Sequence, residues 1–181
     1  MKPEAVHYSG LLYRALNPVW ARTPLSGEGA ARFGGRFNQV GRAALYTSLA
    51  PDTAIREANR VGLLQPTTLV CLRADVGPLV DGTDAAALGE HGATPELLAD
   101  PAWQDAMLAG RAVPTHELAE RLIEAGFAGL IVPSYARGAP ADARNLVLWA
   151  WDGQVTLVDD EGRLGVGWCA GSAAAFVALS G

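Results

Sequence analysis

The sequence predicts a single α+β domain over residues 1–181, with central β-sheets flanked by helices. Half of the 181 residues are hydrophobic and 18% are charged, which is the composition of a globular chain with one sizeable core. Apolar segments typical of strands alternate with amphipathic segments typical of helices, and no repeat or linker divides them. These patterns place the core at about residues 10–160 and leave 161–181 as a C-terminal tail or short helix.

The first half of the chain contains three strand patterns, at residues 10–16, 43–49 and 67–76. The segment between the first two, residues 17–42, is rich in Gly, Pro, Ser and Arg. So long an irregular segment in a compact domain is usually functional or disordered.

A helix is expected over residues 51–62. Pro51 suits its first turn, Asp52 suits its positive end and Gly62 suits its C-terminal cap. The helical spacing predicts an inward face made of Ala54, Ile55, Ala58 and Val61.

The second half begins with short helical pieces over residues 81–113, followed by an amphipathic helix at 114–127 and a buried strand at 128–134. Two further strands are expected at 145–151 and 154–160. Asp152 and Gly153 lie between them, and this dipeptide predicts a β-hairpin.

Charge and composition exclude several classes of function. The net charge is −5 and the pI is near 5.1, so a basic face for direct binding of nucleic acid is not expected. The three histidines are scattered, and no metal site is expected. Cys71 lies in an apolar strand pattern that predicts a buried free thiol. No secretory signal or membrane span is recognisable, which leaves a cytoplasmic location as the expectation.

Common nucleotide and hydrolase motifs are missing from the sequence. There is no Walker loop and no G-x-S-x-G nucleophile elbow. Residues 27–32, GEGAAR, begin like a dinucleotide fingerprint, but Arg32 occupies the third glycine position. No convincing strand precedes this segment and no helix is expected after it, so a Rossmann site is excluded.

Residues 32–38, RFGGRFN, contain the first candidate for a binding site. Gly34 and Gly35 permit unusual backbone angles and close approach of a ligand. Arg36 could therefore present its guanidinium to a diphosphate. The alternative is a glycine turn that carries a solvated arginine.

Four more polar residues have a functional and a structural interpretation. Tyr46 could stack on a flat ring or lie half-buried in a strand. Glu57 lies at the border of its helix's apolar face, as a partly desolvated carboxylate or as a solvated rim residue. Ser134 ends a buried strand, where ligand clefts often open, or is an ordinary turn serine. Arg14, inside the first strand, points to solvent or points inward and needs an anionic partner.

Several of these segments together resemble the RES domain family, which comprises toxins of bacterial type II toxin–antitoxin systems. The matching pieces are LYR (12–14), SGEGAARFGGRFN (26–38), LYTS (45–48), A-x-x-E (54–57), IVPS (131–134) and NLVLW (145–149). They span roughly residues 10–155. The commoner family form has tryptophan after the arginine, where this chain has Phe37.

The resemblance implies an ADP-ribosyltransferase-like fold that consumes NAD⁺ and needs no metal. It implies Arg36, Glu57 and Ser134 as catalytic residues, and it adds Arg14, Tyr46 and Asn145 as residues that bind NAD⁺ with Arg36 and Ser134. Arg14 or Arg36 would hold the diphosphate, and Tyr46 would stack on nicotinamide. Ser134 would bind the nicotinamide-side ribose or position Glu57. The implied partner is an Xre-like DNA-binding antitoxin that blocks the active site.

The residue types suit cleavage of the nicotinamide N-glycosidic bond. A carboxylate beside the ribose stabilises the oxocarbenium character that develops as nicotinamide leaves. Water, phosphate or a protein side chain could accept the ADP-ribose. A protein-specific mono-ADP-ribosyltransferase is therefore the close alternative. A non-catalytic module that binds NAD⁺ or a protein is the alternative from another class.

Overall fold

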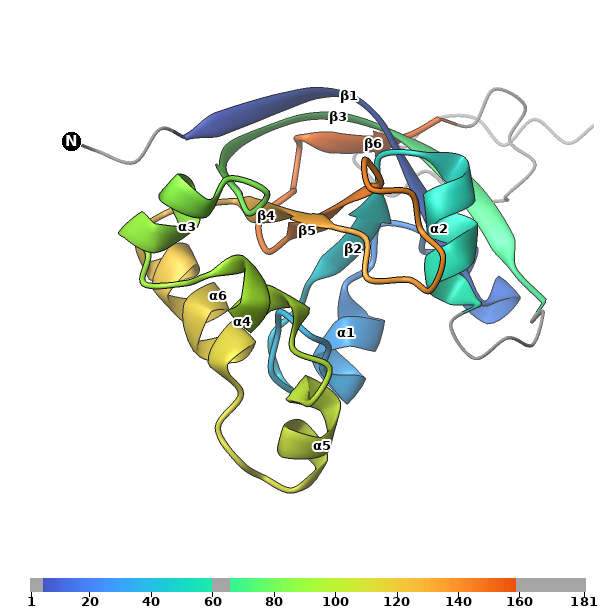
Figure 1. The fold of residues 1–181 in the computed structure, drawn as a ribbon. Coiled ribbons are helices and arrows are strands. Elements are labelled where there is room, and N and C mark those ends of the chain that lie inside the picture. Colours follow the sequence, from blue (N-terminus) through green and yellow to red (C-terminus); the bar gives the residue numbers. More distant parts are fainter. Residues whose placement is uncertain (1–4, 60–65, 159–181) are drawn as a thin grey trace, which may run out of the picture.

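The computed structural model describes residues 5–59 and 66–158. Figure 1 shows the arrangement of the elements. The strands are β1 (Val6–Leu16), β2 (Leu45–Ser48), β3 (Thr68–Asp81), β4 (Gly129–Pro133), β5 (Arg144–Leu148) and β6 (Val155–Leu157). The α-helices are α1 (Glu28–Phe33), α2 (Pro51–Ala58), α3 (Ala85–Glu90), α4 (Pro95–Ala99), α5 (Trp103–Leu108) and α6 (Pro114–Glu124), with a 3₁₀ turn at Pro18–Trp20.

The six strands form one sheet in the order β1-β2-β5-β4-β3-β6. β1 also pairs with β3, antiparallel from Val6↔Leu79 to Leu16↔Thr68, and this pairing closes the sheet into a barrel-like ring. The long β1–β3 ribbon arches over the other strands in Figure 1. β3 and β4 are parallel, whereas the other described strand pairs are antiparallel.

Alternation along the strands separates two hydrophobic clusters. On β5, Leu146 and Leu148 enter the cluster inside the ring, while Val147 enters the cluster on the outer face. α3, α4 and α6 gather on one side of the sheet in Figure 1, and they supply Leu88, Leu98 and Leu118 to this outer cluster. All three leucines are fully buried, and each contributes about 1.5–3 kcal/mol to folding.

The structure confirms the mixed α+β domain and most of the expected elements. The strands expected at 10–16 and 67–76 are parts of longer strands, because β1 and β3 pair along nearly their whole lengths. The strands at 43–49 and 128–134, the helix at 114–127 and the short helices within 81–113 are all present. The expected C-terminal tail or helix at 161–181 lies outside the described residues.

The hairpin predicted at Asp152 and Gly153 is wrong. The turn itself exists, with a hydrogen bond from Gln154 N to Trp151 O and a positive φ of 74° at Gly153. However, β2 and β4 occupy the two edges of β5, so β6 cannot pair with it. β6 adds instead to β3, with Leu72 opposite Leu157.

Two expectations about α2 also need correction. On α2 the buried residues are Thr53 and Ala54, while Ile55 and Ala58 are exposed, so the inward face is turned toward Glu57. The helix ends at Ala58 with Asn59 as its C-cap, and the expected cap Gly62 and core residue Val61 lie outside the described residues.

The segment predicted to be irregular contains α1, which covers most of GEGAAR. Because α1 follows a loop and not a strand, the Rossmann arrangement remains excluded. Cys71 is a free thiol but only half-buried.

Candidate functional site

A cavity of about 400 Å³ opens between α2, the segment around α1 and the outer face of β2 and β5. This volume is typical of sites that bind small molecules or cofactors. The side chains that matter for its chemistry are Tyr13, Arg14, Arg36, Tyr46, Ser48, Glu57, Trp103, Tyr135 and Asn145.

The floor of the cavity is set by the register of β2 and β5. Tyr46 lies opposite Val147 and Ser48 lies opposite Asn145. Residues two apart on a strand point to the same face, so these four side chains share one side of the sheet. All four line the cavity.

Glu57 projects from α2 toward this floor. Its Oε1 accepts a hydrogen bond from Ser134 Oγ at 2.7 Å and a second from Asn145 Nδ2 at 2.7 Å. Two donors on one carboxylate oxygen hold the side chain in one orientation. Hydrogen bonds donated to an ionised carboxylate also stabilise the ionised form. The structure therefore presents a positioned carboxylate at the cavity wall.

Arg36 is buried, with 9% of its surface exposed, and it connects the RFGGRFN segment to the α4–α5 connection. Its Nη1 donates to the carbonyl oxygens of Leu98 and Asp100 at 2.8 and 2.9 Å. The guanidinium also lies over the rings of Trp103 and Tyr135, at 5.6 and 4.5 Å from their centroids. Its position is thus determined by residues far away in the sequence.

Hydrogen bonds from β2 and α6 hold the turn around Arg36. Tyr46 accepts from the backbone N–H of Phe37 at 3.0 Å and donates to Asn38 Oδ1 at 2.7 Å. From α6, the Thr115 hydroxyl donates to the carbonyl oxygen of Arg36. His116 Nε2, also on α6, lies 2.7 Å from the carbonyl oxygen of Gly35. The turn is therefore a rigid part of the cavity wall.

Arg14 points inward, but its described partners are neutral. Its Nη1 donates to the carbonyl oxygens of Pro24 and Ser26 at 2.7 and 2.9 Å. Burial lowers the pKa of Arg14 to about 10, so the side chain still carries its positive charge at neutral pH.

Among the lining residues, Arg14 and Arg36 bring two positive charges against the single carboxylate of Glu57. Tyr135 contributes a neutral phenol, and burial raises its pKa to about 12, with a smaller opposing effect from Arg36. The cavity is therefore locally cationic although the whole chain carries −5. Such a site favours a small ligand with a negative net charge.

Residues 11–166 match the family described as RES domain. The chain belongs to the RES domain family. No curated protein sequence is significantly similar to it. The fold is similar to a chain in the crystal structure of the M. tuberculosis MbcT–MbcA toxin–antitoxin complex, with a TM-score of 0.60, 20% identity, and coverage of 86% of this chain and 84% of that chain.

This RES domain brings the six residues predicted from its sequence to one site, although they differ in position. Arg14, Arg36, Tyr46, Glu57 and Asn145 line the cavity. Ser134 is not among the described lining residues and reaches the site through its hydrogen bond to Glu57.

Sequence reasoning missed several residues of this RES domain's site. Ser48 could have been found, because it lies two residues after Tyr46 and shares its face of the strand. Tyr135 directly follows Ser134. Trp103 lies in a stretch of short helices without any motif, so no local signal pointed to it.

The described residues of this RES domain show neither a metal-binding cluster nor a membrane-spanning helix. They contain no group of three or more His, Cys, Asp or Glu side chains arranged to hold a metal ion. Within the same ranges, none of the helices is long and apolar enough to cross a bilayer.

The close packing around Gly35 leads to a test with a matched control. A methyl group at Gly35 would collide with the Tyr46 hydroxyl and lie 2.7 Å from Asn38 Oδ1. We expect Gly35→Ala to lower the free energy of unfolding by about 1–3 kcal/mol. A methyl group at Gly29, in α1, meets no atom within 4 Å, so Gly29→Ala should raise it by about 0.5–1 kcal/mol. Urea unfolding measures both, and equal shifts would contradict the proposed packing.

Proposed function

We propose that this RES domain is the toxin of a type II toxin–antitoxin pair and that it cleaves the nicotinamide N-glycosidic bond of NAD⁺. The observation that carries the proposal is the Glu57 carboxylate, fixed by Ser134 and Asn145 at the wall of a cavity that also receives two arginines. The cleaved ADP-ribose is transferred to an acceptor, and loss of NAD⁺ or modification of a target arrests growth.

The charge of the cavity supports NAD⁺ as the ligand. The diphosphate of NAD⁺ carries two negative charges, and its nicotinamide ring carries one positive charge. The cavity offers the reverse arrangement, with Arg14 and Arg36 for the diphosphate and Glu57 for the cationic end. A guanidinium has five N–H donors, so the Nη1 bonds of Arg14 to Pro24 and Ser26 leave it able to pair with phosphate oxygens.

Glu57 has the main part in the reaction. As the bond between ribose and nicotinamide breaks, positive charge develops on the ribose carbon, and the bonding electrons leave with neutral nicotinamide. A carboxylate already oriented beside that carbon stabilises the charge without reorganising. Ser134 and Asn145 keep the carboxylate in place, and the Tyr46 ring offers a face against which nicotinamide can stack.

The acceptor determines the product. Water gives ADP-ribose, phosphate gives ADP-ribose-1″-phosphate, and a protein side chain gives a mono-ADP-ribosylated target. Transfer to a protein is therefore an alternative within the same chemistry. A module that binds NAD⁺ without cleaving it is the alternative from another class.

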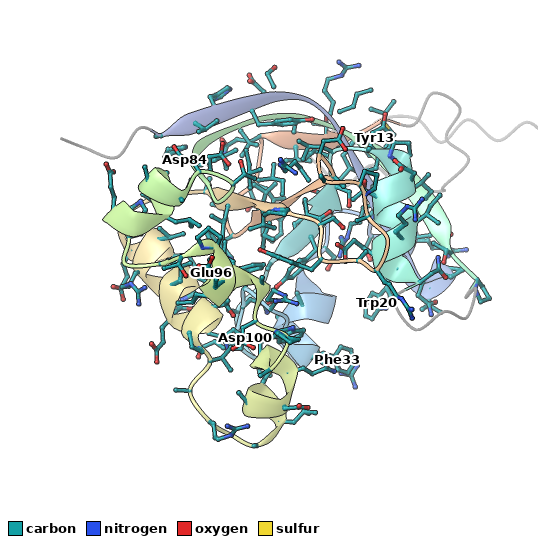
Figure 2. The ribbon with its side chains drawn as sticks, in the orientation of Figure 1. Tyr13, Trp20, Phe33, Asp84, Glu96 and Asp100 are labelled. Atoms are coloured by element: carbon teal, nitrogen blue, oxygen red, sulfur yellow. The ribbon has the colours of Figure 1, made fainter. Side chains whose placement is uncertain are left out.

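The proposed partner is an Xre-like DNA-binding antitoxin that covers the cavity. Two observations support a protein partner at this place. The structural neighbour comes from a toxin–antitoxin complex. Phe33, which precedes the lining residue Gly34, is 63% exposed, and Figure 2 shows it at the end of α1. Leu108 on α5 is 76% exposed and follows Met107, whose sulfur lies close to Gly34. Exposed apolar groups of this kind often mark protein contacts.

The function is tested by incubating the purified protein with NAD⁺ and measuring free nicotinamide, with and without phosphate. We expect release above the no-enzyme level, and the form of ADP-ribose identifies the acceptor. Addition of the antitoxin protein encoded by a neighbouring gene should suppress the release of nicotinamide. Background nicotinamide from a sample that circular dichroism shows to be folded would contradict the proposal. NAD⁺ binding by calorimetry without release would favour the non-catalytic module.

A further inference from the structure

A chain of hydrogen bonds leads from β2 to the carboxylate of Glu57. Ser48 Oγ donates to Asn145 Oδ1 at 2.7 Å, and Asn145 Nδ2 donates to Glu57 Oε1 at 2.7 Å. Ser48 is 3% exposed. We propose that Ser48 is a positioning residue, which acts through Asn145 to orient the Glu57 carboxylate.

The need for Ser48 follows from the two ends of the asparagine amide. An ionised carboxylate only accepts hydrogen bonds, so Asn145 must turn its Nδ2 toward Glu57. Its Oδ1 then faces β2, where it needs a donor, and the Ser48 hydroxyl supplies one. Removal of the Ser48 hydroxyl removes this hydrogen bond. The Asn145 amide then has less preference for its present orientation over the flipped orientation. The flipped amide would place its oxygen against the carboxylate.

The sheet explains why this chain of contacts forms. Ser48 and Asn145 are directly opposite each other on antiparallel β2 and β5, where side chains on one face come within contact distance. Asn145 is in turn opposite Val132 on β4, and Ser134 follows at the end of that strand. The order β2-β5-β4 thus sets Ser48, Asn145 and Ser134 in a row, and the last two donate to the same oxygen of Glu57.

Thr47 provides a matched control on the same strand. It is also buried, and its hydroxyl donates to the carbonyl oxygen of Leu146 at 2.8 Å, outside the chain of contacts that reaches Glu57. Thr47→Val and Ser48→Ala therefore each remove one buried hydroxyl from β2. A general loss of packing or stability would appear in both variants, whereas an effect on Glu57 is expected only from Ser48→Ala.

The first measurement is the titration of the Glu57 side-chain carboxyl by carbon NMR, which needs no turnover. A hydrogen bond to the charged form favours that form, so weakening it disfavours ionisation. We expect Ser48→Ala to move the Glu57 titration midpoint to higher pH. Thr47→Val should leave it in place, and Ser48→Thr, which keeps the hydroxyl, should restore it.

The second measurement concerns activity, and its interpretation rests on the proposed NAD⁺ cleavage. We expect Ser48→Ala to lower kcat/KM by about tenfold, the ratio that matches one lost hydrogen bond, and to move the acid limb of its pH profile upward. In the Asn145→Ala background, Ser48→Ala should have no further effect, because the contact it serves is already absent.

The two measurements separate this inference from the proposed function. An unchanged Glu57 midpoint in Ser48→Ala, or an equal loss of kcat/KM in both backgrounds, would overturn the positioning role while NAD⁺ cleavage stands. A folded wild-type protein that releases no nicotinamide, but whose Glu57 midpoint moves as expected, would overturn the proposed function and leave the positioning role supported.

Discussion

Replacement of Glu57 by glutamine is expected to lower the rate of nicotinamide release from NAD⁺ by about 10²–10³-fold, because it removes a preorganised charge that stabilises the transition state. The amide oxygen of glutamine can still accept from Ser134 Oγ and Asn145 Nδ2, which reach Oε1 in the native protein. The fold should therefore lose only about 1 kcal/mol, the difference between a charged and a neutral acceptor. Steady-state kinetics with circular dichroism measures both effects.

Glu124→Gln is the control for this substitution. Glu124 is an exposed carboxylate at the end of α6 and is not among the residues that line the cavity, so its amide variant should keep wild-type activity. Full activity in Glu57→Gln would show that the carboxylate has no part in the chemistry. A comparable loss in Glu124→Gln would point to a general effect of charge.

The two arginines of RFGGRFN are expected to respond very differently to substitution. Arg36 donates to two backbone carbonyl oxygens and packs against Trp103 and Tyr135. Arg36→Ala leaves those carbonyls without their donor and should lower the free energy of unfolding by about 3 kcal/mol, with loss of NAD⁺ cleavage. Arg32 is exposed and lies over the Phe33 ring at 5.4 Å, so Arg32→Ala should cost less than about 1 kcal/mol.

Urea unfolding and nicotinamide release, measured side by side, test this difference. Arg36→Lys is a second variant in case the alanine protein does not fold. Lysine keeps the charge but lacks the planar fork, so it should recover part of the stability and little activity. Equal unfolding midpoints for Arg36→Ala and Arg32→Ala would show that the contacts of Arg36 with the α4–α5 connection do not hold the site together.

Local patterns predicted the fold elements well wherever one residue's neighbours in the chain decide its conformation. The continuous apolar run of β4 and the apolar stripe of α6 match the structure for this reason. The hairpin prediction failed because Asp152-Gly153 encodes a turn but not a pairing partner. β6 could pair only with a strand that had an unpaired edge. Both edges of β5 are paired, with β2 and β4, so β6 pairs with β3.

The same distinction applies to the site. The glycine pair beside Arg36 suggested a hinge at a ligand site, and Arg36 does line the cavity, but its side chain is held by Leu98, Asp100 and Trp103, which are more than 60 residues away. Arg14 was expected to need an anion if it pointed inward, and its described partners are two backbone carbonyl oxygens, both bound through Nη1. Neither set of partners could be read from the residues next to the arginines.

By itself, the sequence determined the α+β class, most strands and helices, and six polar residues that gather at one cavity. Only the tertiary structure decided how they act together. The hydrogen bonds that orient Glu57 join residues 77, 88 and 97 positions apart, through Ser134, Asn145 and Ser48. Periodicity and turn propensity encode contacts within a few residues, whereas these contacts depend on strand order and register. They exist because folding places β2, β5 and β4 side by side beneath α2.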